Sequence, residues 1–450
     1  MATLQLATWA TNLKYEDLPA SVVEAAVKSF YNWAGCAIGG SAQDAPKIAR
    51  ETMQSFSGGP TTSSILGADG SEKLADAQLA AFVNGISSHV DDYDDTHLDS
   101  LIHPSGPVAS ALLAVAEWTR PVTGHEFITA FVAGVEAECK LGLAVTPDHY
   151  TTGWHITSTA GSIGAAVAVG RLLRLDITQM QHAIGVASTQ VVGMQEHFGS
   201  MTKSFHVGRA AQGGMLAALL AQNQFTSSLQ SLEAERGWLH VVSARENASA
   251  LFDQLGKTWE IEKNSFKPFP CGVVLHPLID AAIQIHRDMA REGIDFSSAK
   301  RVSLQVNSKV LVLTGKTDPT TGLEGKFSLY HAVAVGLLYG EATPTYFTDD
   351  AVLDPTTVEF RKKINVTVDD DHFSKSQTEM TVDVDDKTSF YVHVKNALGS
   401  LDNPLTDAHM KTKFLDQVSK RLGEARAENA FAAFTNIANM TDVGTLGTLY

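Results

Sequence analysis

The chain has 450 residues, of which 44% are hydrophobic and 19% are charged, a composition typical of a globular protein with a substantial buried core. Its 50 acidic and 34 basic residues give a formal net charge of −16, which argues against nucleic acid or a membrane surface as a partner, because both require a basic surface. A small anionic substrate would therefore need cations gathered locally in its binding site.

The cysteine content and the lack of long apolar runs indicate the cellular compartment of the protein. Cys36, Cys139 and Cys271 are too few and too scattered to form a disulfide framework. The N-terminal segment lacks the basic start and the long apolar core of a signal peptide. No apolar run approaches the roughly 18 residues needed to cross a bilayer. We predict a cytoplasmic protein without a membrane segment.

Residues 1–262 mostly show apolar side chains at helical spacing, as in "LPASVVEAAVKSFYNWAGCAIGG". Two segments, residues 159–175 and 208–222, are rich in both glycine and alanine. Alanine favours a helix wherever it occurs, whereas the glycines indicate helices whose backbones approach closely. We therefore expect a tightly packed helical bundle.

The periodicity changes near residue 263. Apolar and polar residues alternate over 301–313, 362–371, 379–386 and 389–395, as expected for strands, and the last two segments flank a short turn typical of a hairpin. Helical spacing returns over 406–422. We predict a mainly α fold. A large all-helical domain built from both chain ends, residues 1–262 and 396–450, is interrupted by an inserted α+β lid domain, residues 263–395.

The segment "HVDDYDDTHLDSLIHPSG", residues 89–106, holds five aspartates and three histidines. One interpretation is a Mg²⁺ site in an aspartate-rich all-α enzyme, because hard cations bind carboxylate oxygens. The chain offers no second metal motif for such an enzyme, and His89 and His97 lack the spacing of a zinc pair. A second interpretation places three aspartates on a solvated face and at helix caps: Asp91, Asp94 and Asp99.

His103 supports a third interpretation, proton chemistry beside a bound anion. Ser105 is a suitable N-cap for the helix that Gly106 and Pro107 would open. His103 would lie near the positive end of this helix, where anions bind favourably. A histidine beside a bound carboxylate and an aspartate can act as an acid or base near neutral pH. We favour this interpretation, with no metal and no cofactor.

Three further loops supply cations and a histidine next to predicted helices. His155 precedes the caps of a Gly/Ala-rich helix, while Lys203, His206 and Arg209 surround a Gly-Ser loop that enters another helix. Lys267 lies in a turn stiffened by two prolines at the predicted domain boundary. Each of these residues alone is compatible with a core histidine or a surface lysine. Together, in a chain without a nucleotide-binding fingerprint, they favour a cofactor-free site for a small polycarboxylate.

Six sequence blocks, in order, resemble the MmgE/PrpD family, which includes 2-methylcitrate dehydratase, cis-aconitate decarboxylase and iminodisuccinate epimerase. The blocks are "AAFVNGISSHVDDYDDTH…HPSGPVASALLAVAE", "GWHITSTAGSIGAA", "GSMTKSFHVGRAAQGG", "KPFPCGVVLHPLIDAA", "GKFSLYHAVA" and "ALGSLDNPLTDAHMKTKF". They extend over essentially the whole chain. The resemblance implies a helical domain with an inserted lid, a homodimer, and a metal-free active site in the cleft between domain and lid.

The resemblance also implies particular site residues, taken from the matching blocks: Asp92, His103, His155, Lys203 and Lys267. The spacing between aspartate and histidine is one residue longer than in the animal decarboxylases, so Asp94 and Asp95 compete with Asp92 for its role. The decarboxylases carry a tyrosine in the "FS" block. Here Tyr330 and His331 are adjacent, and His331 takes that place by register.

We therefore expect a cofactor-independent lyase that acts on a small di- or tricarboxylic acid through a carbanion-like intermediate. We favour dehydration of a 2-methylcitrate- or alkylcitrate-like acid, because the decarboxylase tyrosine is displaced. The alternatives are a cis-aconitate-type decarboxylase, an epimerase or isomerase of a dicarboxylate, and the Mg²⁺-dependent enzyme. The expected catalytic residues are Asp92, His103 and His155. The expected substrate-binding residues are Lys203, His206, Lys267, Tyr330 and His331.

Overall fold

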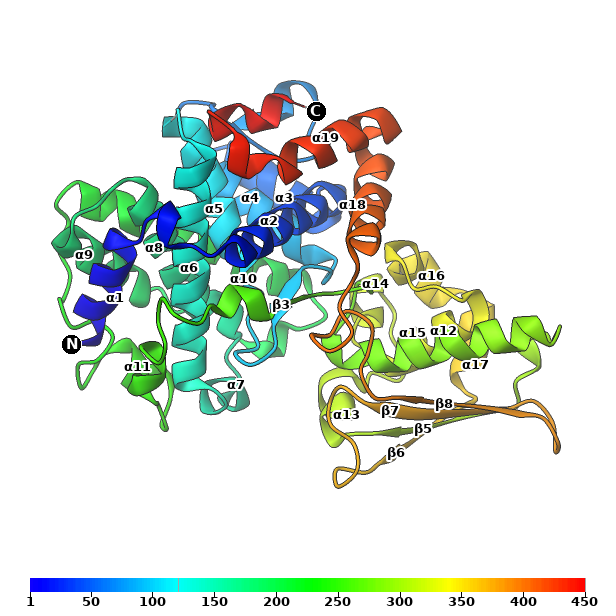
Figure 1. Cartoon of the computed structure of the whole chain (residues 1–450). Helices are drawn as coiled ribbons and strands as arrows, with labels where there is room; N and C mark the ends of the chain where they lie inside the picture. Colours follow the sequence, from blue (N-terminus) through cyan, green and yellow to red (C-terminus); the bar gives the residue numbers. More distant parts are fainter. Residues whose placement is uncertain (120, 450) are drawn as a thin grey trace.

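The computed structural model describes residues 1–119 and 121–449 and shows a mainly α protein with one four-stranded sheet. The helical part and the part that holds the sheet lie side by side, and both chain ends belong to the helical part (Figure 1). This arrangement confirms the predicted fold class, while the residue boundaries given for the domains stay a prediction. Among the described residues, no helix is both long and apolar enough to cross a bilayer.

The helical part is a bundle in which α8 and α10 are packed centrally. Its helices are α1 (Ala2–Asn12), α2 (Ala20–Gly40), α3 (Asp44–Gln54), α4 (Ala77–Val90), α5 (Ser105–Thr119), α6 (Gly124–Val145), α7 (Asp148–Thr152), α8 (Ile156–Leu172), α9 (Ile177–Ser188), α10 (Met201–Gln222) and α11 (Trp238–Val242). A Cβ atom added to Gly85 would lie 2.7 Å from the Cα atom of Gly208. The glycines therefore let α4 and α10 approach closely, as their composition predicts.

Two C-terminal helices, α18 (Asp407–Leu422) and α19 (Glu424–Thr435), return to the bundle and pack against α2. Thr406 begins α18 with a capping box, in which its side chain accepts a hydrogen bond from the main-chain N–H of His409. Phe414 of α18 is buried against Gly35 of α2, where a Cβ atom would meet its ring. Both chain ends thus contribute to one core.

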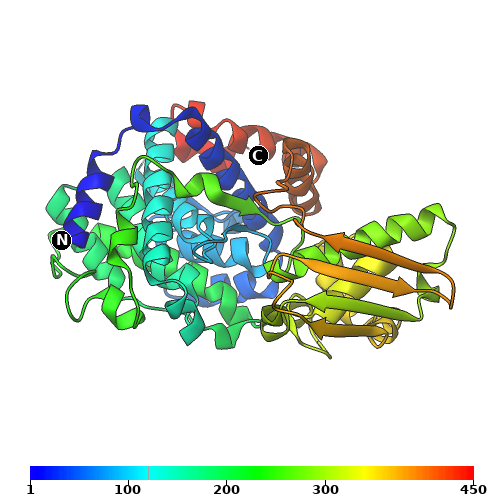
Figure 2. The ribbon, with the colours of Figure 1, turned by 60° about the horizontal axis from the view of Figure 1, so that its bottom comes forward.

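The inserted part contains the sheet, with strand order β6-β5-β7-β8. The strands are β5 (Arg301–Val306), β6 (Ile364–Val368), β7 (Thr378–Asp383) and β8 (Ser389–Val394). β7 and β8 form the predicted antiparallel hairpin, and β5 pairs in parallel with β6. The helices α12 (His276–Arg291) and α15 (Leu329–Tyr339) cover one face of the sheet (Figures 1 and 2).

One strand prediction is wrong in its second half. The alternating pattern over 301–313 predicted a single strand, but β5 ends at Val306 and α13 (Ser308–Thr314) follows. The side chain of Asn307 accepts a hydrogen bond from the main-chain N–H of Lys309 and begins this helix. The remaining helices of the insert are α14 (Gly322–Gly325), α16 (Asp349–Leu353) and α17 (Pro355–Arg361).

Two short strands connect the acidic segment to the start of the insert. β3 (Asp95–His97) pairs antiparallel with β4 (Asn264–Phe266), so that Asp95 lies opposite Phe266. A second two-stranded pair, β1 (Ser63–Ser64) with β2 (Leu74–Ala75), lies elsewhere in the helical part. The β3–β4 pairing brings the segment that contains His103 next to the turn that contains Lys267.

Candidate active site

The acidic segment turns sharply after α4 and is largely buried. Asp91 is 5% exposed and Asp94 is fully buried, whereas Asp99 is exposed. The interpretation of Asp91 and Asp94 as part of a solvated face is therefore wrong. Asp92 has a φ of +51°, a left-handed conformation that aspartate tolerates better than most residues. The turn directs the Asp92 carboxylate into the interior, where cations from distant segments meet it.

Two lysines hold the Asp92 carboxylate. The Nζ atom of Lys203, in the first turn of α10, lies 3.0 Å from Asp92 Oδ1, and that of Lys267, directly after β4, lies 2.6 Å from it. Burial alone raises the pKa of Asp92, but the two ammonium groups outweigh it and hold this pKa well below its ordinary value. These three groups carry a net charge of +1, which the Asp94 carboxylate, 3.9 Å from Lys267, partly offsets, and the two ammonium groups suit an anionic ligand.

His103 and His89 form a pair around Asp94. His89 Nδ1 lies 2.6 Å from Asp94 Oδ2, and its Nε2 accepts a hydrogen bond of 2.9 Å from Lys203. The Nδ1 atom of His103 lies 2.8 Å from the main-chain oxygen of Asp95, which can only accept, so Nδ1 carries the proton. The Nε2 atom of a neutral His103 is therefore unprotonated and can act as a base.

His155 has an unused nitrogen at the site. Gly153, with a φ of +114°, ends α7 and lets the chain turn so that His155 occupies the N-cap position of α8. Its Nδ1 atom lies 2.9 Å from His206 Nδ1, whereas its Nε2 atom is buried without a hydrogen-bond partner among the described residues. A buried polar atom without a partner is costly, so a substrate oxygen or water is the expected partner of Nε2.

A cavity of about 70 Å³ brings five of the predicted residues together: Asp92, His103, His155, Lys203 and Lys267. Of the three competing aspartates, Asp92 lines this cavity, while Asp94 supports the histidines and Asp95 hydrogen-bonds Ser105 and Asn264. His206 lies behind His155 rather than in the lining. The cavity thus combines two ammonium groups, one carboxylate and two imidazoles in a volume that holds a few water molecules.

The structure places Tyr330 and His331 apart from this cluster. Neither is among the described residues that line the cavity, and His331 Nε2 bonds the main-chain oxygen of Tyr346 at 2.7 Å within the insert. Phe327, three residues before Tyr330, does line the cavity, as do Phe198 and Tyr150. Phe198 and Phe327 lie in turns and Tyr150 lies in α7, and a single aromatic side chain gives no signal of its own in the sequence.

Three buried lysines fix the main chain of the acidic turn. They donate to three successive carbonyl oxygens, those of residues 91, 92 and 93, at 2.8, 3.1 and 2.7 Å respectively. In that order, the donors are Lys326 of the insert, Lys267 after β4, and Lys413 of α18. A turn with a left-handed residue is thereby held from three distant parts of the chain, which fixes the position of the Asp92 carboxylate.

Replacement of Lys413 by methionine should test this positioning. Lys413 does not line the cavity, so Lys413→Met should lower kcat by about 10- to 100-fold with little change in KM, since small misplacements of reacting groups have effects of this size. Burial lowers the pKa of Lys413 to about 8, so the wild type should lose activity as the pH rises through this value. The Lys413→Met variant should not show this loss of activity at basic pH.

The matched control is Lys411→Met, because Lys411 lies on the same helix with its side chain 44% exposed. Steady-state kinetics from about pH 6 to 9 would measure both effects. A Lys413→Met enzyme with wild-type kcat, or with the same basic limb as the wild type, would contradict the positioning role.

One group of ligand atoms in the site could approach a metal ion. Atoms of His89, Asp94 and His103 lie within 4.8 Å of one another. However, Lys203 already donates to His89, and the Nζ atom of Lys267 lies 3.9 Å from Asp94 Oδ1. Two ammonium groups at this range would repel a divalent cation. The expectation of a metal-free site stays a prediction that this electrostatic arrangement favours.

Comparison with known proteins identifies the class of protein that this fold and site define. The N-terminal domain of the MmgE/PrpD family matches residues 4–250, and its C-terminal domain matches residues 269–438. The chain therefore belongs to the MmgE/PrpD family.

Particular relatives show what members of this family do. The chain is 26% identical to a cis-aconitate decarboxylase of Homo sapiens over 381 residues, which cover 82% of this chain and 78% of the relative. It is 24% identical to a cis-aconitate decarboxylase of Aspergillus terreus (98% and 94% covered) and 22% identical to a probable 2-methylcitrate dehydratase of Saccharomyces cerevisiae (70% and 64% covered). These matches confirm the prediction of a lyase of the MmgE/PrpD type.

Proposed function

We propose that the protein is a cofactor-independent lyase that dehydrates a tricarboxylic acid of the 2-methylcitrate kind. The observation that supports this most directly is the position of the His103 imidazole in the same cavity as the Lys203 and Lys267 ammonium groups. The two lysines would bind substrate carboxylates, and the free Nε2 atom of His155 would bind a further oxygen. A cytoplasmic homodimer remains part of the proposal.

The proposed reaction begins with proton removal from the carbon next to a carboxylate. His103 Nε2 takes the proton, and the electron pair moves toward the carboxylate, where Lys203 and Lys267 stabilise the developing charge. The imidazolium that forms lies 3.6 Å from Asp94 Oδ1 and is stabilised by it. His103 then transfers this proton to the β-hydroxyl group, which leaves as water. A carbon–carbon double bond forms between the two carbons.

The protonation state of His103 favours dehydration over decarboxylation. Burial lowers the pKa of His103 to about 3, against an opposing effect of Asp94. A neutral imidazole can accept a proton at once, whereas decarboxylation needs a proton donor for the carbanion left by CO₂. Decarboxylation of a cis-aconitate-like acid is the second candidate, and the names of the human and Aspergillus relatives favour it.

Proton NMR of the enzyme with 2-methylcitrate, citrate, cis-aconitate and simple dicarboxylates, in the presence of EDTA, tests the proposal. We expect loss of water from 2-methylcitrate. Loss of CO₂ from cis-aconitate would establish the second candidate instead, and epimerisation alone would exclude both. Activity that appears only after Mg²⁺ replaces EDTA would contradict cofactor independence.

The pH profile should reflect the neutral state of His103. A general base must be unprotonated, so on the acid side activity should fall as the pH decreases toward the lowered pKa of about 3, and not near the ordinary value of 6.5. The measurement is kcat/KM from about pH 4 to 8, with circular dichroism at each pH to confirm the fold. An acid limb between about pH 6 and 7 in the folded wild type would contradict this assignment.

Lys203→Ala should weaken substrate binding, and it should also lower kcat because Lys203 is proposed to stabilise the charge that develops in the reaction. A hydrogen bond to a charged group contributes about 1.5–3 kcal/mol, so its loss should raise KM by about 10- to 100-fold. Lys47, an exposed lysine on α3, provides the control Lys47→Ala, which should leave KM unchanged. An unchanged KM in Lys203→Ala would remove Lys203 from the substrate-binding site.

A further inference from the structure

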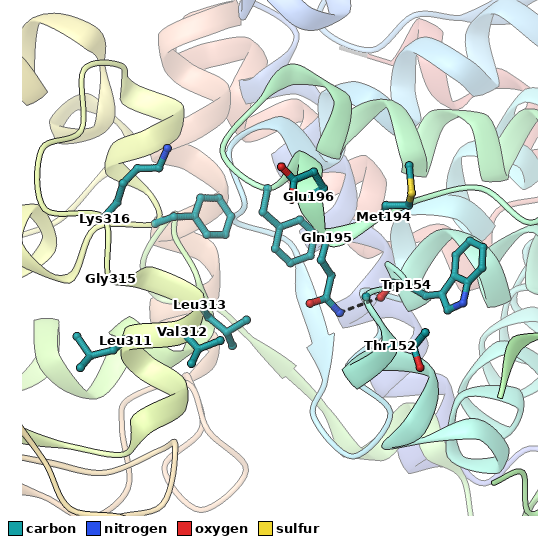
Figure 3. A pocket seen from close by; sticks show the side chains of 13 residues that line it. Thr152, Trp154, Met194, Gln195, Glu196, Leu311, Val312, Leu313, Gly315 and Lys316 are labelled. Atoms are coloured by element: carbon teal, nitrogen blue, oxygen red, sulfur yellow. Dashed lines mark hydrogen bonds between the residues drawn. The ribbon is translucent and has the colours of Figure 1, made fainter. Parts of the chain in front are cut away.

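A second, larger cavity opens directly outside the polar one. It has a volume of about 750 Å³ and lies between the helical part and the insert (Figure 3). Trp154 and Met194 line it on the helical side, and Leu311 and Val312 of α13 line it on the other side. Its other apolar lining residues, Phe198, Leu313 and Phe327, also line the polar cavity, so the two cavities are adjacent and share this wall.

Two aromatic rings mark the boundary between the cavities. The Phe198 and Phe327 rings stack with centroids 5.8 Å apart, one from each part of the molecule. Both centroids lie close to Lys203 Nζ, at 5.4 and 5.6 Å. Phe198 and Phe327 therefore lie beside the Lys203 ammonium group and also line the outer cavity.

The sizes of the cavities indicate how a ligand divides between them. The inner volume of about 70 Å³ suits a few water molecules, whereas about 750 Å³ lies in the range of pockets that hold whole organic ligands. The reacting carboxylate and its neighbouring carbon can approach the inner groups. Any longer substituent must extend into the outer cavity.

The walls of the outer cavity favour an apolar substituent. Val312 is 81% exposed and Met194 is 53% exposed, on opposite walls, so both have apolar surface available to a ligand. Lys316 at the edge is paired with Glu324 at 2.8 Å, which offsets its charge. The side-chain amide of Gln195 donates to main-chain oxygens of Tyr150 and Trp154. Lys316 and Gln195 thus already have partners within the protein, so a second anionic group of a ligand would gain little affinity from them.

We infer that the outer cavity binds an unbranched aliphatic chain, longer than methyl, attached to the polycarboxylate substrate. This inference rests on the proposed function and specifies its substrate class as 2-alkyl-substituted polycarboxylic acids. The carboxylates bind Lys203 and Lys267, and the chain passes Phe198 and Phe327 to lie between Met194 and Val312. Each methylene that leaves water should raise affinity by about two- to fourfold until the chain fills the cavity.

Calorimetry with 2-methylsuccinate and 2-octylsuccinate tests the chain site without requiring turnover. We expect 2-octylsuccinate to bind at least ten times more tightly than 2-methylsuccinate, with a more negative heat-capacity change because apolar surface is buried. Val312→Asp and Met194→Asp should each remove most of that gain. The control Val241→Asp, at a valine that is 68% exposed on α11 and not in the cavity lining, should keep it.

Equal affinity for the two succinates, or an undiminished gain in both Val312→Asp and Met194→Asp, would overturn the inference. The proposed reaction is judged separately, by turnover of 2-methylcitrate. Chain-dependent binding without turnover of any acid would support the chain site and contradict the reaction. Turnover of 2-methylcitrate with no chain-dependent binding would support the proposed reaction and contradict the chain site.

Discussion

His103→Ala is expected to lower kcat by about 10²-fold or more, because it removes the group proposed to transfer the proton. The neutral imidazole lines the cavity, and its Nδ1 atom is fixed by the main-chain oxygen of Asp95 and by Thr96 Oγ1 at 3.1 Å. These contacts orient Nε2 as the base. Steady-state kinetics with the substrate found by NMR would measure the loss.

Two controls separate chemistry from folding in this experiment. His240→Ala replaces a histidine whose side chain is 40% exposed and which is not among the residues that line the cavity, so kcat of this variant should be unchanged. His103→Gln keeps a polar side chain of similar size but cannot act as a base near neutral pH, so it should be as inactive as the alanine variant. Turnover near the wild-type rate in either His103 variant would exclude His103 as the base.

Lys267→Met is expected to destabilise the fold as well as abolish activity. The buried ammonium group contacts Asp92 twice, at its Oδ1 atom and at its main-chain oxygen. Breaking a buried ion pair by removing one partner costs about 3–5 kcal/mol, and Lys203 still contacts Asp92, so we expect about 3 kcal/mol. The free energy of unfolding, measured with urea, would show the difference.

The matched control for this variant is Lys257→Met, because Lys257 is an exposed lysine ten residues earlier in the chain. Its substitution should change the free energy of unfolding by less than about 0.5 kcal/mol, as expected at an exposed position. If Lys267→Met were as stable as Lys257→Met, the Asp92–Lys267 pair would not be the buried electrostatic contact described above.

Much of the fold follows from periodicity in the sequence. Apolar side chains recur mostly at helical spacing over residues 1–262 and 406–422. In the hairpin of β7 and β8, apolar and polar residues alternate with a period of two. The failure at 307–313 has a local cause. Asn307 caps a helix whose apolar residues also fit an alternating pattern, and periodicity alone does not separate the two over so short a segment.

The site was only partly predictable, for reasons of distance along the chain. Asp91 resembles a surface residue because its positive partner, Lys326, is 235 residues away, whereas the partners of Asp94, His89 and His103, lie in the same segment. The lysines that hold residues 91, 92 and 93 are 235, 175 and 320 residues away. His331 was expected in the site by register alone, and the orientation of α15, which turns this side chain toward Tyr346, is set by packing that no local pattern reveals.

The most direct test of the central claim is the incorporation of solvent deuterium, measured by NMR in D₂O with EDTA for the wild type and His103→Gln. The central claim is that His103 transfers a proton at the carbon beside a substrate carboxylate without a metal. The wild type should place one deuterium at that carbon, in the acid formed by hydration of the unsaturated product. His103→Gln should incorporate at least about 10²-fold more slowly. Incorporation at the wild-type rate in His103→Gln would contradict the account.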